Sequence, residues 1–100
     1  MSGVHSRPYY SLAQTASAVE NGKAFGGQGF EAITVHVEGI VSGDIVQIQA
    51  RNDDELTFVQ IGSDITADGV YAVELGAMHY RGIVSDNSGG GTVTIAFLGA

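Results

Sequence analysis

Three consecutive acidic residues, Asp53, Asp54 and Glu55, are the densest charge in the chain and its first candidates for metal binding or acid–base chemistry. Calcium loops place oxygen ligands at alternate positions, with a glycine at the bend, so that several ligands converge on one ion. Three adjacent acids diverge instead, because neighbouring residues at a strand end point to opposite faces. The pattern therefore favours a solvated turn, with a weak cation site as the alternative.

The histidines and serines do not form a metal-binding or catalytic pattern. His36 and His79 lie in or beside expected strands, and His5 is near the N-terminus. The chain has no HxH or HxxxH pair, no cysteine to supply a thiolate, and no G-x-S-x-G around a serine. We therefore expect histidines on polar faces, no metal or other cofactor, and no enzymatic activity. A small jelly-roll hydrolase, with a site assembled from distant residues, is the enzyme alternative.

Two glycine-rich segments, Gly26-Gly27-Gln28-Gly29 and Gly89-Gly90-Gly91, have some likeness to phosphate-binding loops. Such loops work because glycines open a helix whose N-terminal amides face the anion. The first segment instead precedes an expected strand, and no Lys-Ser or Lys-Thr pair follows it. We predict a flexible hinge or a bulge at both places.

Composition excludes several classes of partner. The formal net charge is −7, and only Arg7, Lys23, Arg51 and Arg81 are positive. Four scattered cations cannot build the basic patch that nucleic-acid binding or an anionic membrane requires. No apolar run approaches the roughly 20 residues that span a bilayer, and the N-terminus lacks the apolar stretch of a secretory signal. We expect neither nucleic acid nor membrane as a partner.

From Phe30 onward, apolar and polar residues alternate with the period of two that is typical of half-buried strands. The acidic turn at 52–55 joins two of these runs into a hairpin over 44–62, and turn residues recur every 8 to 12 positions. This spacing predicts an all-β fold, an antiparallel β-sandwich of jelly-roll type. The residues expected in its core are Ile33, Val35, Val37, Val46, Ile48, Ala50, Phe58, Val59, Ile61, Val93, Ile95 and Phe97.

The N-terminal part of the chain has few β-branched residues and many small ones. We expect an extended N-terminal arm over residues 1–20 and a sandwich domain over 21–100, entered through the Gly-rich segment 21–29. Residues 11–25 fit either a helix, from the capping-box spacing at 11–14, or a hairpin turning at Asn21-Gly22. The remaining sandwich is small and leaves sheet edges open, which favours an oligomer or a large docking surface.

Five segments between Asn21 and the C-terminus resemble small β-sandwich virion proteins of tailed bacteriophages. They are N-G-K-A-F-G-G-Q-G-F-E-A, V-Q-I-Q-A-R-N-D-D-E-L-T-F-V-Q-I-G, I-T-A-D-G-V-Y-A-V-E, H-Y-R-G-I-V and G-G-G-T-V-T-I-A-F. One departure is Gly82, where the related proteins tend to have a bulky residue. The packing around Gly82 is therefore expected to differ from that in the related proteins.

The resemblance implies a capsid cement or decoration protein, bound to the major capsid protein on the capsid exterior of the virion, often as a homotrimer. It implies that the arm reaches a neighbouring subunit, with Arg7, Tyr9, Tyr10, Leu12 and Phe25 at the capsid or subunit interface. Many copies then turn modest contacts into strong collective retention. Related sandwiches also occur in tails and head fibres, so the alternative is a module that binds host surface glycans.

Overall fold

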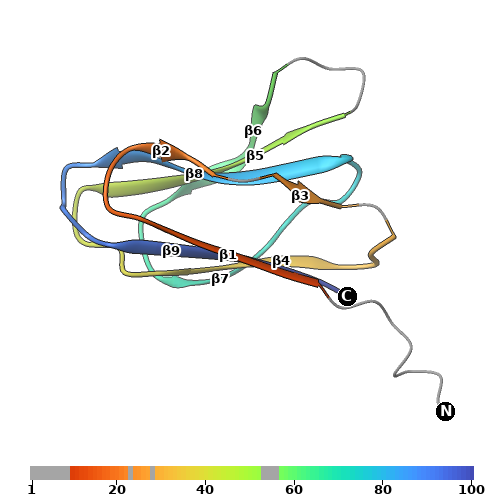
Figure 1. Ribbon diagram of the computed structural model, residues 1–100, viewed down its shortest axis with the longest axis horizontal. Coiled ribbons are helices and arrows are strands. Elements are labelled where there is room, and N and C mark those ends of the chain that lie inside the picture. The colour runs from red at the N-terminus through yellow and green to blue at the C-terminus, as the bar shows by residue number, and fades with distance from the viewer. Residues whose placement is uncertain (1–9, 23, 28, 53–56) are drawn as a thin grey trace, which may run out of the picture.

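The structure is a computed structural model that describes residues 10–22, 24–27, 29–52 and 57–100; for residues 10–14 and 20 it describes the backbone. Every regular element in these ranges is a β-strand (Figure 1), as the alternating pattern predicts. The described part of the chain has no helix that is long and apolar enough to cross a membrane. The strands are β1 (Tyr10–Ala16), β2 (Glu20–Asn21), β3 (Phe25–Gly26), β4 (Ile33–Glu38), β5 (Asp44–Arg51), β6 (Val59–Ile65), β7 (Gly69–Ala72), β8 (His79–Asn87) and β9 (Val93–Gly99).

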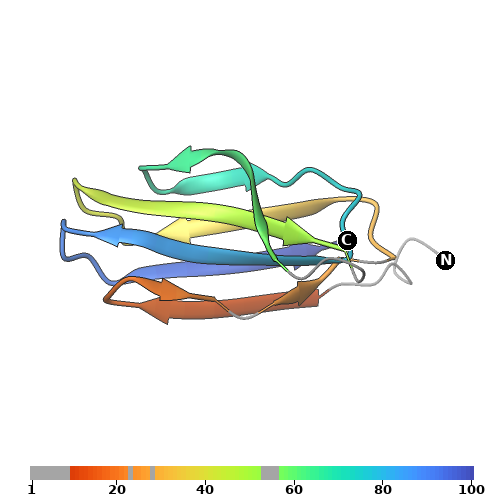
Figure 2. The same cartoon turned by 90° about the horizontal axis from the view of Figure 1, so that it is seen from above.

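The strands form two antiparallel sheets packed face to face. Sheet A has the order β1-β9-β4-β7, and sheet B has the order β2-β8-β5-β6 with β3 also paired to β8. Figure 1 shows the sheets as two layers, and Figure 2 shows their strands running nearly parallel to one long axis. β5 and β6 form the predicted hairpin, with Ala50 opposite Val59. The β-sandwich that the strand spacing predicts is confirmed.

The core lies between the sheets and follows the alternation in the sequence. In β4, β5 and β9 every second residue is buried, because the side chains of a strand point alternately to its two faces. Nine of the predicted core residues are buried in this way: Ile33, Val35, Val37, Val46, Ile48, Ala50, Val93, Ile95 and Phe97. Ile61 packs against this core while partly exposed.

Two of the predicted core positions in the hairpin are wrong. Val59 is opposite the buried Ala50 but is itself 60% exposed, since β6 is an edge strand of sheet B. Phe58 lies against Arg51 and Arg81, whose side chains belong to the outer face of sheet B. An apolar residue next to a turn can therefore continue the alternating pattern without facing the core.

Gly82 is buried in β8 and faces the opposite sheet. A Cβ atom at this position would lie 2.8 Å from Cγ2 and 3.1 Å from Cδ1 of Ile95, and 3.7 Å from Cδ1 of Ile48. Ile95 belongs to β9 of sheet A, so its side chain fills the space that a larger residue at 82 would take. Close packing against Ile95 therefore accounts for a glycine at this position.

The expected boundary between arm and domain differs from the structure. The sequence predicts an arm over residues 1–20, but Tyr10–Ala16 form β1, which pairs with β9 along its whole length. Residues 17–19 then carry the chain from sheet A to sheet B (Figure 1). Pairing with β9 supplies the order that the local composition does not, since strand propensity depends strongly on context.

Neither alternative for residues 11–25 is correct. No helix forms there, and Asn21-Gly22 is not a hairpin turn, because β2 and β3 both pair with the same strand β8. Asn21 is opposite Ile83 and Phe25 is opposite Tyr80, so the chain continues along β8 in one direction. The sandwich domain therefore includes the segment from residue 10 onward.

Candidate functional site

The residues expected to contact a capsid or a subunit fall into three groups. Arg7 and Tyr9 lie outside the described residues. Tyr10 and Leu12 belong to β1, where their backbones are opposite Gly99 and Phe97 of β9. This placement puts both residues on an edge strand of sheet A rather than on a separate arm.

Phe25 forms the third group, and its prediction as an exposed interface anchor is wrong. Its side chain is 0% exposed and stacks on Phe97 and Phe30, with ring centroids 5.3 and 5.7 Å apart. The cause is the pairing of β3 with β8, which turns Phe25 inward beside Tyr80. Phe25 therefore stabilises the sandwich instead of binding a partner.

Gly27, in the first Gly-rich segment, packs at this same end of the core. A Cβ on Gly27 would lie 2.3 Å from Cε2 of Tyr80, and the Gly27 amide donates a 2.9 Å hydrogen bond to the carbonyl of Met78. The buried Tyr80 hydroxyl donates to the carbonyl of Glu74 at 2.8 Å and accepts from the Ala77 amide at 3.2 Å. Gly27 is thus required by close packing against a tyrosine ring.

The acidic turn Asp53–Glu55 lies outside the described residues, so its solvated-turn prediction is untested. Among the residues that the structure describes, no three His, Asp or Glu side chains gather closely enough to hold a metal ion. His79 begins β8, and His36 lies in β4. The structure brings neither histidine into such a cluster.

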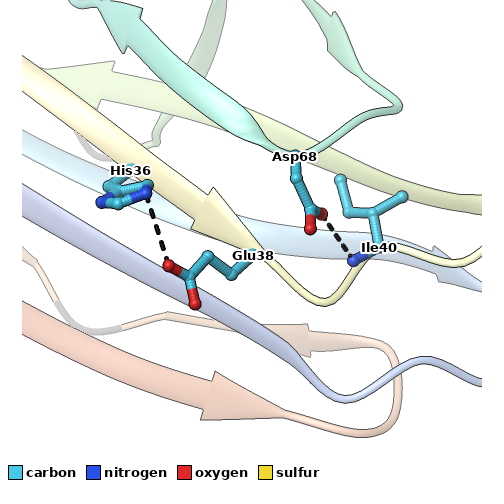
Figure 3. A network of polar contacts seen from close by, with 4 residues as sticks. All are labelled: His36, Glu38, Ile40 and Asp68. Carbon is cyan, nitrogen blue, oxygen red and sulfur yellow. Dashed lines mark hydrogen bonds and ion pairs between the residues drawn. The ribbon is translucent and has the colours of Figure 1, made fainter.

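His36 is part of the polar outer face of sheet A (Figure 3). Its side chain is 46% exposed, and Nε2 lies 3.4 Å from Oε1 of Glu38, which is 67% exposed. Beside this pair, Asp68 accepts a 2.9 Å hydrogen bond from the amide of Ile40, which joins the β6–β7 and β4–β5 connections. An ion pair this exposed contributes little to stability, so the prediction of a polar-face histidine is confirmed for His36.

The second Gly-rich segment is an anion-binding loop whose anion is the protein's own carboxylate. Asp44 is only 1% exposed. Its Oδ1 accepts from the Gly89 amide at 2.9 Å and from Nδ2 of Asn87 at 3.1 Å. Its Oδ2 accepts from the amides of Gly91 and Val41, both at 3.0 Å. Both carboxylate oxygens are thus fully used.

This geometry overturns the prediction of a flexible hinge at Gly89-Gly90-Gly91. A Cβ on Gly89 would lie 2.6 Å from two backbone oxygens, and a Cβ on Gly91 would lie 2.5 Å from Oδ2 of Asp44. Glycine is needed because the backbone approaches the carboxylate so closely. The hydrogen bond from Val41 contributes most, and together with those from Gly91, Gly89 and Asn87 it outweighs burial and lowers the pKa of Asp44 below its usual 3.8.

Sequence reasoning missed a cluster on the outer face of sheet B, which we call the Arg–Phe cluster: Arg51, Phe58 and Arg81. The guanidinium carbons of Arg81 and Arg51 lie 4.2 and 5.3 Å from the centre of the Phe58 ring. Nε of Arg81 also donates to Oε1 of Gln49 at 2.9 Å. The cluster holds two of the four Lys and Arg residues of a chain with net charge −7. The alternating patterns of β5 and β8 place Arg51 and Arg81 on the outer face of sheet B. This alternation is the sequence signal that could have predicted the cluster.

Amide side chains continue this surface along sheet B. Nε2 of Gln60 and Nε2 of Gln47 donate to Oδ1 of Asp64 at 2.8 and 3.1 Å. This part of the surface is therefore polar, and its side chains are hydrogen-bonded to one another. The described aromatic side chains do not add the open platform of rings that glycan binding favours. Phe25, Tyr80 and Phe97 are buried, and Phe30 and Tyr71 pack against the core.

A groove of about 230 Å³ opens between the edge strands β6 and β7. Its floor includes the buried Val35, Ile48 and Val73. The carboxylate of Asp64, which also lines it, is held by the two glutamines described above. Ligand sites usually enclose roughly 300–1,000 Å³ with several convergent polar groups. The groove is therefore a small apolar gap at the open side of the sandwich.

Comparison with known proteins shows a likeness of fold. No family model matches the chain, and no curated protein matches its sequence. Among solved structures, the crystal structure of the SPBc2 prophage-derived protein YomS is similar, with a TM-score of 0.68 at 14% sequence identity. The match covers 93% of this chain and 94% of that chain. At such low identity the likeness establishes a shared β-sandwich fold over nearly the whole length of both proteins.

Proposed function

We propose that the chain is a structural protein of a tailed-phage virion, and specifically a cement protein on the exterior of the capsid. The observation that carries the proposal is the match of the whole sandwich to a prophage-derived protein. The segments from Asn21 onward that resemble phage virion proteins support it independently of the fold. Fold likeness alone does not determine function, so the proposal rests on both together.

The physical properties of the sandwich suit a mechanical role. Each buried polar side-chain atom in the described residues has a hydrogen-bond partner, so the domain has a well-determined interior. Bound in many copies, the domain adds buried contact area to a shell under internal pressure.

The proposed capsid contact is the N-terminal end of the chain. Arg7 and Tyr9 remain the proposed anchors because arginine and tyrosine are enriched at the centres of protein interfaces. Tyr10 and Leu12 are not kept in this contact, because they belong to β1 and lie opposite Gly99 and Phe97 of β9. Phe25 is not part of it, since it is buried.

Deletion of residues 2–9 tests this contact, because it leaves β1 and its pairing with β9 intact. We expect the shortened chain to keep its circular-dichroism spectrum and melting temperature. We also expect binding to purified capsids that lack the protein to fall by about tenfold or more, as loss of central anchors does. The double substitution Arg7→Ala with Tyr9→Ala is a milder test of the same contact, because it removes the two proposed anchors without shortening the chain.

Deletion of residues 2–16 is the matched comparison, since it also removes β1 and should unfold sheet A. Unchanged capsid binding by the 2–9 deletion would reject the proposed contact. If the full chain bound no capsids but bound host surface glycans, the tail or head-fibre alternative would replace the cement role.

A further inference from the structure

The sandwich has four sheet edges, and they differ in how well they are protected. Sheet A ends in β1 and β7, and sheet B ends in β6 and in the short strands β2 and β3. An edge strand presents unpaired N–H and C=O groups that can pair with another chain. Proteins prevent this with short strands, charges, bulges or covering segments.

Three of these edges have such protection. β7 has four residues, and β2 and β3 have two each. β6 is longer, but it contains the charged Asp64, a glycine with a φ of +71° at Gly62, and a shift in its register with β5. None of these edges offers a long regular ladder.

Among the described residues, nothing protects the edge of β1 in this way. Tyr10–Ala16 pair with Gly99–Val93 in one unbroken register of seven residue pairs. The strand contains no glycine, proline or charged residue. Within the described part of the chain, no strand pairs with its other edge. Its outward-facing backbone groups therefore form a regular ladder to which an added strand can pair.

Charge indicates what the added strand is. Two copies of a chain with net charge −7 repel each other over most of their surfaces. β1 and its neighbour β9 contain no Asp, Glu, Lys, Arg or His, whereas β4, β5, β6 and β8 each carry charged or titratable residues. β7, the other edge of sheet A, has no Asp, Glu, Lys, Arg or His either, but it has only four residues against the seven of β1. Among the described edges, β1 therefore combines a long ladder with a low electrostatic cost of approach.

We propose that β1 pairs antiparallel with β1 of a second copy, which joins the two copies of sheet A into one continuous sheet. A two-fold axis through Ala13 aligns all seven residues, so that Ser11 is opposite Thr15 of the other copy and no like charges meet. Such an interface is self-complementary and closed, because each copy uses up its exposed edge. It gives a dimer and does not depend on the proposed virion role.

The test places like charges on the proposed axis. Ala13→Glu puts two carboxylates opposite each other, and Ala13→Lys puts two ammonium groups there. By light scattering and analytical ultracentrifugation at tens of micromolar, we expect a dimer for the unmodified chain. Each variant alone should be monomeric, with the dissociation constant raised by about tenfold or more. An equal mixture of the two variants should form a heterodimer again.

Ala72→Glu is the matched control. Ala72 is exposed on β7, the opposite edge of the same sheet, so this variant should remain a dimer. If Ala13→Glu fails to fold by circular dichroism, the double variant Ser11→Glu with Thr15→Glu replaces it, since the proposed register places residue 11 of each copy opposite residue 15 of the other. Hydrogen exchange at the β1 amides should also slow as the concentration of the unmodified chain rises.

A monomer or a trimer of the unmodified chain would overturn the proposal, and so would an Ala13→Glu variant that folds and stays dimeric. These outcomes are separate from the capsid test. Loss of capsid binding in the 2–9 deletion leaves β1 in place, whereas the Ala13 variants keep Arg7 and Tyr9. Each proposal can therefore fail while the other stands.

Discussion

The two ends of the sandwich are fastened by opposite kinds of interaction. At one end a single buried carboxylate, Asp44, holds the loop before β5 and the loop between β8 and β9 through backbone amides and Asn87. At the other end, Phe25, Phe30 and Phe97 stack while Tyr80 fills the space beside Gly27. The first end depends on a negative charge, and the second depends on buried volume.

This difference shows how a small domain without disulfides closes a sandwich at both ends. Loops with many exposed backbone groups need hydrogen-bond partners, which one carboxylate can supply to several amides at once. The other end buries large apolar area instead, which the aromatic rings of Phe25, Phe97 and Tyr80 supply. The two ends should therefore respond differently to substitution and to pH.

Phe25→Ala should have the largest effect. Removing a fully buried ring leaves a cavity beside Phe30 and Phe97, and such changes cost about 3–5 kcal/mol in the free energy of unfolding. Urea denaturation at neutral pH measures it. Val59→Ala is the matched control, because that side chain is 60% exposed and its removal should change stability by less than about 0.5 kcal/mol. Similar losses in both variants would contradict the importance of the aromatic end.

Asp44→Asn should have the next largest effect and should depend on pH. An amide has one acceptor oxygen where the carboxylate has two, so some of the amides of Val41, Gly89 and Gly91 lose their partners. Because the pKa of Asp44 is lower in the folded chain, the folded state binds fewer protons at this group. The contribution of the Asp44 carboxylate to the free energy of unfolding is therefore complete above pH 3.8. It is lost as the pH falls through the lower pKa of the folded state.

The measurement is the stability difference between the unmodified chain and Asp44→Asn, from denaturation between neutral pH and about pH 3. The difference should be constant near neutral pH and should shrink on acidification. Taking the difference between the two proteins cancels the effect of the other acidic residues, which both proteins share. Phe25→Ala should show no such change in its difference. A pH-independent Asp44→Asn difference would break the contrast between the two ends.

Gly82→Ala, between the two ends, should have the smallest effect. The added Cβ would lie 2.8 Å from Cγ2 of Ile95, a side-chain atom that can move. Overpacking costs about 1–3 kcal/mol, and the gain from replacing glycine in a strand offsets part of it, so we expect a loss of about 1 kcal/mol. Thermal and urea unfolding test this. A loss as large as that of Phe25→Ala would mean that the middle of the core, not its ends, limits stability.

The predictable parts of the fold are those with a local signal. Alternation at Ile33–Val37, Val46–Ala50 and Val93–Phe97 predicted both the strands and the faces they bury, because strand side chains have a period of two. β1 was not predictable in this way. Its sequence Y-S-L-A-Q-T-A has few β-branched residues, and its order comes from pairing with β9, some 80 positions away.

The candidate sites were less predictable because their partners are distant in the sequence. The bond between Asp44 and the Gly91 amide joins residues 47 positions apart. The ring of Phe58 is placed by arginines on two different strands. Phe25 is an aromatic residue, a type common in interface anchors, yet the pairing of β3 with β8 directs its side chain into the core.

The sequence by itself determined that the chain is an all-β sandwich, because strand periodicity and turn residues act locally and repeat along the chain. Only the tertiary structure decided that residues 10–16 belong to the sandwich, that a glycine loop encloses the protein's own carboxylate, and that β1 is an edge strand of sheet A. Each of these depends on which strands meet, and that choice is made by packing over the whole core and not by any one segment.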